Sequence, residues 1–505
     1  MILRPSAVFG LLMIVGGALP AVATASSVHA SASRSTIPGP ATAEYKTWRA
    51  AVLASHMASR GCFEADYPSK NWKEVSCGTP RERPQIIPRE KQIVRPLDES
   101  TSGDYTMTST AAIASASGSL RSIENVTSVL GFGSTNTNGC QPGQATCPVP
   151  NEFNLQLNTE ATLPGAAICK GSANPNCTGW MQFVYDSGGS INIQSWAINF
   201  GNPPCPSNFN LPPGPRQSCG QKTASFTLPF QPLLKLPDLA GAVLTGDVFK
   251  DNAGLIVDEV ALEVRGKIYA AHGTDIVGAL GNWKTTQFNV YGNSGLDKSI
   301  FNSGSLVSVA VNVNNDAGGT VTCSQLKAGD TTGESTNLTV MPCAATNTPA
   351  PSNLHGIAFN EGVVPVISSV SPPGGPRGGG TLVTITASTS QASTNNTFVV
   401  NGFNPNAVIK FGNNGATAVS CTTSTTSSTC NVRSPAASGG GNVSVGVTAA
   451  NVFQNGVAGP TSAAVPFQYF VVGPPPVYTT CQPCYDSNRQ CIKVTGGYEC
   501  QGLPQ

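Results

Sequence analysis

The sequence contains few charged residues, which make up 11% of its 505 positions, against about 25% in an average soluble protein. The 28 Lys and Arg residues nearly balance the 27 Asp and Glu residues, so no positive surface is expected for nucleic acid or anionic lipid. Aromatic residues are also scarce, at 7%, whereas glycine (54) and proline (39) are frequent. This composition argues against long helices and favours many short strands joined by turns. We therefore expect an all-β protein without a nucleic-acid partner.

Long apolar segments are absent beyond the N-terminus. The first residues carry one positive charge, Arg4, followed by an apolar run over residues 7–19 and by small residues that include the A-x-A pattern Ala23–Ala25. This order is typical of a secretory signal peptide. We expect residues 1–25 to be removed and the chain to be secreted, extracellular or at the cell surface. No later segment approaches the roughly 18 apolar residues of a membrane span, so no transmembrane segment is expected in the mature chain.

Histidine is scarce as well, with four residues and none beside a cysteine pair, so we expect no metal site and no cofactor. The sixteen cysteines, by contrast, are even in number and mostly occur as close pairs. In an exported chain this spacing indicates local disulfides. The expected pairs are Cys62–Cys77, Cys140–Cys147, Cys169–Cys177, Cys205–Cys219, Cys323–Cys343 and Cys421–Cys430.

Recognisable catalytic motifs are missing too. The sequence has no G-x-S-x-G nucleophile turn and no H-E-x-x-H zinc helix. Acidic residues do gather in one region, at Asp247, Asp251, Asp258, Glu259 and Glu263. On a strand Asp258 and Glu259 point to opposite faces, so they would not share one site. We interpret these acids as solvated strand charges and assign no catalytic residue.

Residues 26–99 are expected to form a linker, one short helix and a charged, proline-rich strap. Between residues 42 and 59, apolar side chains recur at helical spacing, at Tyr45, Trp48 and Val52. Residues 60–99 contain five prolines, which oppose both a helix and a sheet ladder. An extended, solvated segment is therefore predicted there, closed into a loop by the Cys62–Cys77 disulfide.

Residues 100–345 show repeated strand-like runs without helical patterns between them. In the run 255–265, apolar side chains such as Val260 and Leu262 share one face, and Glu259 and Glu263 share the other. Such alternation is typical of a half-buried antiparallel strand. We expect one large β-sandwich domain, followed by a linker over residues 346–362 that contains Thr, Asn and Pro.

Residues 363–471 contain an ordered series of motifs. They are a strand that ends in the Ser371-Pro372 turn, a glycine-rich loop followed by Thr381-Leu-Val-Thr-Ile385, the hairpin strand Ala407-Val-Ile-Lys-Phe411, the pair Val432-Arg-Ser-Pro435 and Asn442-Val-Ser-Val-Gly-Val447, and the closing strand Pro466-Phe-Gln-Tyr-Phe470. This series resembles an IPT/TIG domain, which implies an immunoglobulin-like β-sandwich of the kind found at cell surfaces and as an accessory module of secreted bacterial enzymes. The polar stretch 387–397 is an insertion relative to the family pattern.

The C-terminal segment, residues 472–505, holds Cys481, Cys484, Cys491 and Cys500 and resembles the last half of an EGF-like module. Four cysteines permit three pairings, and the sequence does not choose among them. A segment of this length cannot bury its own core, so disulfides are expected to hold it. Three further stretches are Gly61-Cys-Phe-Glu-Ala-Asp-Tyr-Pro68, Gly179-Trp-Met-Gln-Phe-Val-Tyr185 and Ile193-Gln-Ser-Trp-Ala-Ile-Asn-Phe-Gly201. Through them residues 42–345 resemble the N-terminal part of a group of secreted bacterial proteins, and this resemblance implies no function.

Two tryptophans and two glutamines form the candidate ligand site. Trp180 and Gln182 share one face of a predicted strand, and Gln194 and Trp196 share a face of the next. Paired side by side, they would offer aromatic faces and planar amides, which suit a glycan. The same tryptophans could equally be core residues of the sandwich. A third interpretation is a Gln/Glu pair of the kind used by glutamic peptidases, with Gln182 or Gln194 as the amide, although the Trp-Tyr-Glu motif that would supply the acid is missing.

These observations favour a secreted or cell-surface multidomain binding or adhesion protein, with a glycan or another cell-envelope component as its ligand. The alternative is a secreted hydrolase that cleaves glycan or peptide, with residues 100–345 as the catalytic unit and the IPT/TIG-like domain as an accessory module. An acid within reach of Gln182 or Gln194 would favour the hydrolase.

Export and oxidation can be tested together by the intact mass of the native secreted protein. We expect an N-terminus at Ser26 or Ser31 and most cysteines unreactive toward alkylation before reduction, because the signal pattern and the paired cysteines point independently to an oxidising compartment. Alkylation of all sixteen thiols without reduction would contradict the prediction.

Overall fold

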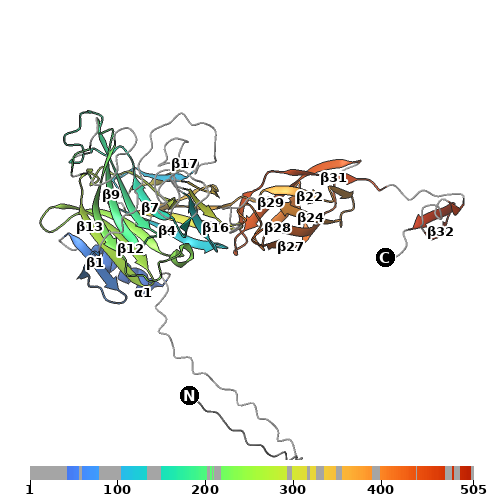
Figure 1. Ribbon diagram of the computed structural model, residues 1–505, viewed down its shortest axis with the longest axis horizontal. Helices are drawn as coiled ribbons and strands as arrows, with labels where there is room; N and C mark the ends of the chain where they lie inside the picture. The colour runs from blue at the N-terminus through green and yellow to red at the C-terminus, as the bar shows by residue number, and fades with distance from the viewer. Residues whose placement is uncertain are drawn as a thin grey trace, which may run out of the picture.

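The computed structural model describes residues 42–55, 60–78, 104–132, 149–165, 167–201, 205–207, 209, 218–292, 298–314, 319–325, 335–348, 355–388, 399–438, 441–472, 480–482 and 490–501. Within these ranges the chain consists mainly of β-strands and contains one α-helix, α1 (Ala43–Ala54). This helix is too short to cross a membrane, and the described ranges contain no other candidate. Figure 1 shows two β-rich bodies in succession, with a small hairpin near the C-terminus. The prediction of an all-β fold is confirmed.

The first body is a sandwich of two antiparallel sheets. One sheet has ten strands in the order β19-β21-β16-β4-β11-β12-β13-β1-β2, with β20 paired to β21. Its strands are β1 (Gly61–Asp66), β2 (Lys73–Val75), β4 (Ser115–Glu124), β11 (Val243–Lys250), β12 (Ile256–Val264), β13 (Lys267–Thr274), β16 (Leu306–Asn314), β19 (Leu338–Val340), β20 (Ala344–Asn347) and β21 (His355–Val363).

The facing sheet has seven strands in the order β10-β9-β8-β7-β14-β3-β17. They are β3 (Tyr105–Ser109), β7 (Asn154–Thr159), β8 (Thr178–Asp186), β9 (Ser190–Ile198), β10 (Cys219–Thr227), β14 (Thr285–Tyr291) and β17 (Val321–Gln325). A smaller sheet in the order β18-β15-β5-β6 contains β5 (Val129–Phe132), β6 (Val149–Pro150), β15 (Lys298–Phe301) and β18 (Ser335–Thr336). A short 3₁₀ turn, η2, spans Leu236–Leu239.

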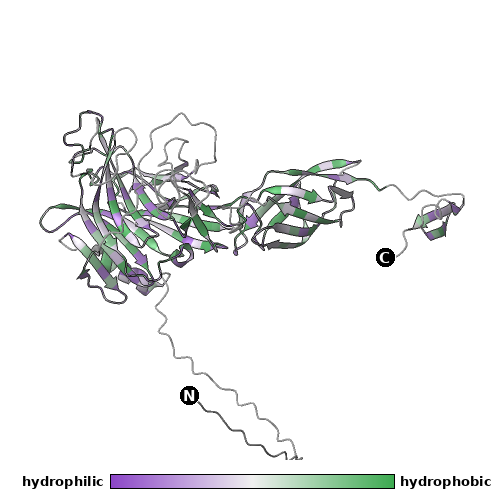
Figure 2. Cartoon of the chain, in the orientation of Figure 1, coloured by the Kyte–Doolittle hydropathy of each residue, from purple (hydrophilic) through white to green (hydrophobic). Residues whose placement is uncertain are grey.

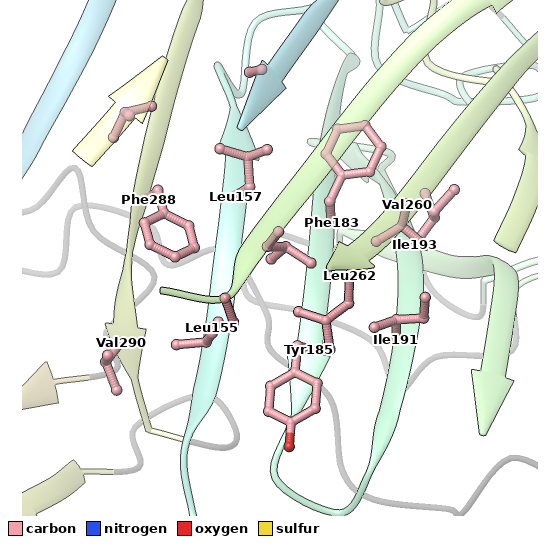
Figure 3. Packing of buried hydrophobic residues seen from close by; sticks show 14 of the residues in the cluster. Leu155, Leu157, Phe183, Tyr185, Ile191, Ile193, Val260, Leu262, Phe288 and Val290 are labelled. Carbon is pink, nitrogen blue, oxygen red and sulfur yellow. The ribbon is translucent and has the colours of Figure 1, made fainter. Parts of the chain in front are cut away.

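Strand alternation builds the core between the two large sheets. Hydrophobic and hydrophilic residues alternate along the strands (Figure 2), because successive side chains point to opposite faces. Figure 3 shows the buried residues that meet between the layers, which include Phe183, Tyr185, Ile191 and Ile193 on one side and Val260 and Leu262 on the other. Gly246 of β11 faces this core, and a Cβ at its position would lie 2.3 Å from a ring carbon of Phe183. The glycine therefore leaves the space that the phenylalanine ring occupies.

Helix α1 covers part of the outer face of the ten-stranded sheet. Thr42 caps its first turn, since its hydroxyl accepts a hydrogen bond from the backbone N–H of Tyr45 at 3.2 Å. Tyr45, Trp48 and Val52 are buried in a cluster with apolar residues of β12 and β13. The helix predicted from the spacing of these three side chains is thus confirmed.

Part of the predicted proline-rich strap is a strand. β1 pairs with both β13 and β2, which places Gly61–Asp66 inside the ten-stranded sheet. The prediction of an extended, solvated segment over residues 60–99 was therefore wrong for residues 61–66. The prolines that oppose a ladder begin at Pro68, after β1 has ended. Residues 79–99 lie outside the described ranges.

The second body is a smaller sandwich. One of its sheets has the order β22-β24-β28-β27, and the other has the order β23-β31-β29-β25-β26 with β30 paired to β29. Its core holds apolar residues from both sheets, among them Ile385, Ile409 and Phe467. The strands are β22 (Ile367–Ser371), β23 (Gly374–Pro376), β24 (Leu382–Ala387), β25 (Val408–Phe411), β26 (Asn414–Gly415), β27 (Thr417–Thr423), β28 (Ser428–Arg433), β29 (Val443–Val452), β30 (Ala458–Thr461) and β31 (Val465–Phe470).

Strand β21 connects the two bodies and corrects the predicted linker. It pairs with β16 from His355 to Gly362, so the prediction of a linker over residues 346–362 was wrong for residues 355–362. The inward side chains Ile357 and Phe359 are buried, and their burial holds this segment in the sheet. At the last residue of β21, Val363, the backbone carbonyl accepts a hydrogen bond from Asn451 Nδ2 at 3.0 Å, which links the two sandwiches.

The disulfides follow the sequence spacing. Within the described residues, five predicted pairs are bonded: Cys62–Cys77, Cys169–Cys177, Cys205–Cys219, Cys323–Cys343 and Cys421–Cys430. Of the possibilities left open in the C-terminal segment, the structure contains Cys481–Cys491, beside the hairpin of β32 (Gln490–Val494) and β33 (Gly497–Gln501). Residues 1–25, Cys140, Cys147 and Cys484 lie outside the described ranges.

The contact between Gly246 and Phe183 can be tested by Gly246→Ala. We expect this substitution to lower the free energy of unfolding by about 1–3 kcal/mol, because the added methyl group would overlap the ring in a packed core. Thermal unfolding by circular dichroism measures the effect. Gly378→Ala is the control, since an added Cβ there meets nothing within 4 Å. Equal, small effects of both substitutions would contradict the packing argument.

Candidate functional site

The four predicted ligand residues do lie side by side. β8 and β9 form a hairpin in which Trp180 is opposite Trp196 and Gln182 is opposite Gln194. The tight turn between the strands is closed by a hydrogen bond from Gly189 N to the carbonyl of Asp186 at 2.8 Å, with Gly189 at a φ of 87°. The two strands therefore pair with these faces aligned, which is the condition for the predicted side-by-side arrangement.

These four side chains do not form an open platform. The exposed fractions are 4% for Trp180, 0% for Gln182, 3% for Gln194 and 0% for Trp196. The expectation of a solvent-open ligand surface at these residues was wrong. They are also not part of the core between the sheets, because the indoles pack in a separate cluster with Ile198 on the outer face of the seven-stranded sheet.

The indole N–H groups are both satisfied within the protein. Trp180 Nε1 donates to the backbone carbonyl of Thr159 at 3.0 Å, and Trp196 Nε1 donates to Gln182 Oε1 at 3.2 Å. Buried tryptophans usually find such partners. The second bond ties the aromatic pair directly to the neighbouring carboxamides.

Eight carboxamide side chains share this outer face on four neighbouring strands, and we call them the amide face. Four of them, Gln194, Gln182, Asn158 and Gln287, are directly opposite one another across β9, β8, β7 and β14, and we call such a row a level. Two residues further along the strands, the next level contains Asn192, Gln156 and Asn289. Apart from the partly buried Gln287, all of them are buried. The members are Asn154, Gln156, Asn158, Gln182, Asn192, Gln194, Gln287 and Asn289.

Hydrogen bonds connect neighbouring members of the amide face. Gln182 Nε2 donates to Gln156 Oε1 at 3.0 Å and to Asn158 Oδ1 at 3.2 Å. Gln194 Nε2 donates to Asn192 Oδ1 at 3.1 Å, whereas Gln194 Oε1 is buried without a partner. A buried acceptor that has lost its water and gained no donor is costly. The network therefore retains an acceptor that a ligand hydroxyl could satisfy.

Two carboxyl groups meet at one border of the amide face. Asn289 Nδ2 donates to Asp104 Oδ1 at 2.6 Å and to Glu361 Oε2 at 3.1 Å, and Gln287 Nε2 donates to Asp104 Oδ2 at 3.2 Å. Burial raises the pKa of Asp104 to about 6, although hydrogen bonds from Tyr291, Asn289 and Gln287 oppose the shift. Burial, and then the nearby Asp104 carboxylate, raise the pKa of Glu361 to about 8. Near neutral pH these shifts favour an ionised Asp104 and a protonated Glu361.

The acids of the first sandwich are not solvated strand charges, contrary to the prediction. Asp247, Asp258, Glu259 and Glu263 are buried, and only Asp251 lies in a turn, where it accepts bonds from backbone N–H groups. The burial of these acids could not be predicted, because alternation shows which face of a strand a side chain is on but not whether another element covers that face. Glu263, for example, is on the outer face of β12, where Arg49 of helix α1 pairs with it.

Asp247, Glu259 and His272 stand opposite one another on β11, β12 and β13. His272 Nε2 lies 2.6 Å from Glu259 Oε2, and both side chains are buried beside Phe63. Burial, and then the Glu259 carboxylate, raise the pKa of Asp247 to about 7. In the described part of the chain, no group of three or more His, Cys, Asp or Glu side chains has metal-binding geometry.

Sequence reasoning missed most of the amide face and both border acids. The signal was present as amides at every second residue, in Asn154-Leu-Gln-Leu-Asn158 and Gln287-Phe-Asn289.

Comparison of the chain with protein-family models found no match, and comparison with curated proteins found none. The interpretation of the site therefore rests on its own chemistry.

The buried carboxyl groups predict how stability depends on pH. The unfolded pKa values lie near 4, and the folded values of Asp104, Asp247 and Glu361 lie at about 6, 7 and 8. Because the folded state holds these protons more tightly, the free energy of unfolding decreases as the pH rises from about 4 to 8. We expect a melting temperature at least about 5 °C higher at pH 5 than at pH 8.

Glu361→Gln should reduce this difference, because it removes the group with the highest of the three folded pKa values and keeps an oxygen acceptor toward Asn289. Glu74→Gln, at an exposed position on β2, should leave the difference unchanged. A protein more stable at pH 8 than at pH 5 would show that these carboxyl groups are ionised without cost in the folded state.

Proposed function

We propose that the protein is an exported binding protein whose ligand is a glycan or another polyhydroxylated component of the cell envelope. The amide face is the observation that carries this proposal. A layer that needed only to be covered would be apolar, since each buried carboxamide must find partners. Here seven of the eight positions at two levels of four adjacent strands hold a carboxamide, and Val184 holds the eighth.

Carboxamides suit sugars because each offers a donor and an acceptor in one plane, as neighbouring hydroxyl groups require. Trp180 and Trp196 lie at the same face and supply flat apolar surfaces for a sugar ring. The amide face is buried in the structure. The proposal therefore includes an opening of this face on binding.

Three further features support export and a surface role. The N-terminal pattern indicates a signal peptide, and five predicted disulfides in the described residues suit an oxidising compartment. Residues 363–471 resemble IPT/TIG domains, which serve as accessory and adhesion modules, including in bacteria. We propose that this second sandwich holds the first sandwich away from the surface to which the protein is attached.

A secreted hydrolase is the second candidate, and Asp104 is the observation that favours it. Its carboxyl group borders the amide face, bonds to Gln287 and shares Asn289 with Glu361. A carboxyl pair with raised pKa values is suited to general acid and base catalysis. However, neither Gln182 nor Gln194 bonds to an acid among the described residues, so the Gln/Glu pair of glutamic peptidases is not formed at those positions.

A glycan array and polysaccharide pull-down with the full mature chain test the proposal. We expect binding to neutral polysaccharide, with a change in tryptophan fluorescence, and a loss of at least about tenfold in affinity for Gln194→Leu, because this removes the unpartnered acceptor. Asn431→Ala, on the exposed face of β28 in the second sandwich, is the matched control and should bind normally.

Circular dichroism establishes that each variant folds. Undiminished binding by Gln194→Leu and by Gln182→Leu would place the ligand elsewhere, and no binding to any glycan would refute the proposal. Hydrolysis of a bound polysaccharide that disappears in Asp104→Asn would establish the hydrolase instead.

A further inference from the structure

Asp258 is a carboxylic acid placed inside the core of the first sandwich. It lies on β12 two residues before Val260 and on the same, inward face. Its exposed fraction is 0%, and neither carboxyl oxygen has a hydrogen-bond partner. An isolated buried carboxylate is strongly disfavoured, so a buried acid is normally paired, hydrogen-bonded or neutralised. The structure gives Asp258 no protein partner for any of these.

Two other orphaned oxygens lie on the strands around Asp258. Across the sheet its neighbour is Gly273 of β13, and a Cβ at Gly273 would lie 3.0 Å from Thr223 Oγ1. Thr223 sits at a bulge of β10, and its hydroxyl oxygen is buried without a partner. Glycine at position 273 thus leaves the space that the Thr223 side chain occupies beside the neighbour of Asp258.

Ser195 of β9 approaches the same region from the facing sheet. Its hydroxyl is buried and has no partner. β9 packs on both β12 and β13, and Figure 3 shows Ile193 beside Val260 and Ile191 beside Leu262. Because side chains repeat every second residue, Ser195 is the next inward position after Ile193 on β9, and Asp258 is the inward position before Val260 on β12.

The charge around this cluster is negative. Asp275 directly follows β13, and its carboxylate accepts bonds from the backbone N–H groups of Val277, Gly278 and Leu280 at 2.7–3.1 Å. Burial, and then this second carboxylate, raise the pKa of Asp258 well above its usual range. Lys222, adjacent to Thr223, is in register with Gln194 on the opposite face, so it does not point into the cluster.

We propose that Asp258, Ser195 and Thr223 form a binding site for a hard cation, Ca²⁺, between the two sheets of the first sandwich. The available donors are carboxylate and hydroxyl oxygens, which hard cations prefer over soft metals. Asp258 and Asp275 supply two negative charges against the two positive charges of the ion. Protonation of Asp258 alone would not satisfy the site, because the O–H group of the protonated side chain would still have no hydrogen-bond acceptor.

The site would join strands from both sheets of the first sandwich. β12 and β13 belong to the ten-stranded sheet, and β9 and β10 belong to the seven-stranded sheet. A cation coordinated from both would stabilise the folded state in proportion to its free concentration, because the unfolded chain lacks the assembled donors.

Thermal unfolding of the full mature chain in EDTA and in Ca²⁺ tests this proposal. We expect millimolar Ca²⁺ to raise the melting temperature by about 5 °C, with a smaller effect of Mg²⁺ and none of Na⁺ at matched ionic strength. Asp258→Asn should abolish the Ca²⁺ effect. Asp251→Asn, in the turn between β11 and β12, is the matched control and should retain it, since its oxygen still caps the turn.

Two milder variants keep the proposal testable if Asp258→Asn does not fold. Ser195→Ala and Thr223→Val each remove one donor and bury no new charge, so each should weaken Ca²⁺ binding at least about fivefold by isothermal titration calorimetry. A melting temperature insensitive to all three cations would overturn the proposal. So would a Ca²⁺ effect that persists undiminished in these two variants, because the ion would then bind elsewhere.

Discussion

Phe183 and Phe288 project from the seven-stranded sheet onto glycines of the facing sheet, Phe183 onto Gly246 and Phe288 onto Gly118. This contact lets the two layers approach closely, since a Cβ at either glycine would overlap an aromatic ring. Once these rings point inward, strand alternation decides the rest. The inward face of the seven-stranded sheet must be apolar, and alternation directs the carboxamides to its outer face. That face is also buried, so the carboxamides of the amide face depend on hydrogen bonds to one another.

Buried polar groups then set the conditions in which the fold is stable. A sandwich with an apolar core gains stability from burial at any pH, but this one also buries carboxyl groups such as Asp104, Asp247 and Glu361. Their raised pKa values mean that folding takes up protons. The disulfides act independently of this effect because they constrain the unfolded chain. The molecule is therefore best suited to an oxidising and mildly acidic medium.

The fold class, helix α1 and five disulfide pairs could be read from the sequence, because each depends on local pattern: alternation, helical spacing or close cysteines. Alternation also placed Trp180 with Gln182 on one face and Gln194 with Trp196 on one face of the next strand. Burial of these residues could not be predicted, since a strand pattern shows which side chains share a face but not what covers that face. Strand β21 was missed for a related reason, because its pairing with β16 joins residues distant in sequence.

The buried acids of β12 show the same limit: a strand pattern does not reveal whether a face is covered. Alternation correctly predicts that Asp258 and Glu259 are on opposite faces of their strand. Their charge, however, predicts contact with solvent, whereas both side chains are buried. Glu259 finds His272, whereas Asp258 finds no protein partner. A charged residue inside a strand therefore indicates solvent only if the strand has an open face, and topology alone decides whether it has one.

Adjacent residues on one strand connect the two proposed sites. Gln194 belongs to the amide face, and Ser195, the next residue of β9, points inward into the sandwich. On β10 the bulge between Lys222 and Ala224 turns Thr223 toward Gly273, while Lys222 stays in register with Gln194. Any ion that fixes Ser195 and Thr223 also fixes the backbone that carries Gln194 and its neighbours. Occupancy of the interior site would thus lower the freedom of the amide face without touching it, because one pleated backbone forms the wall of both.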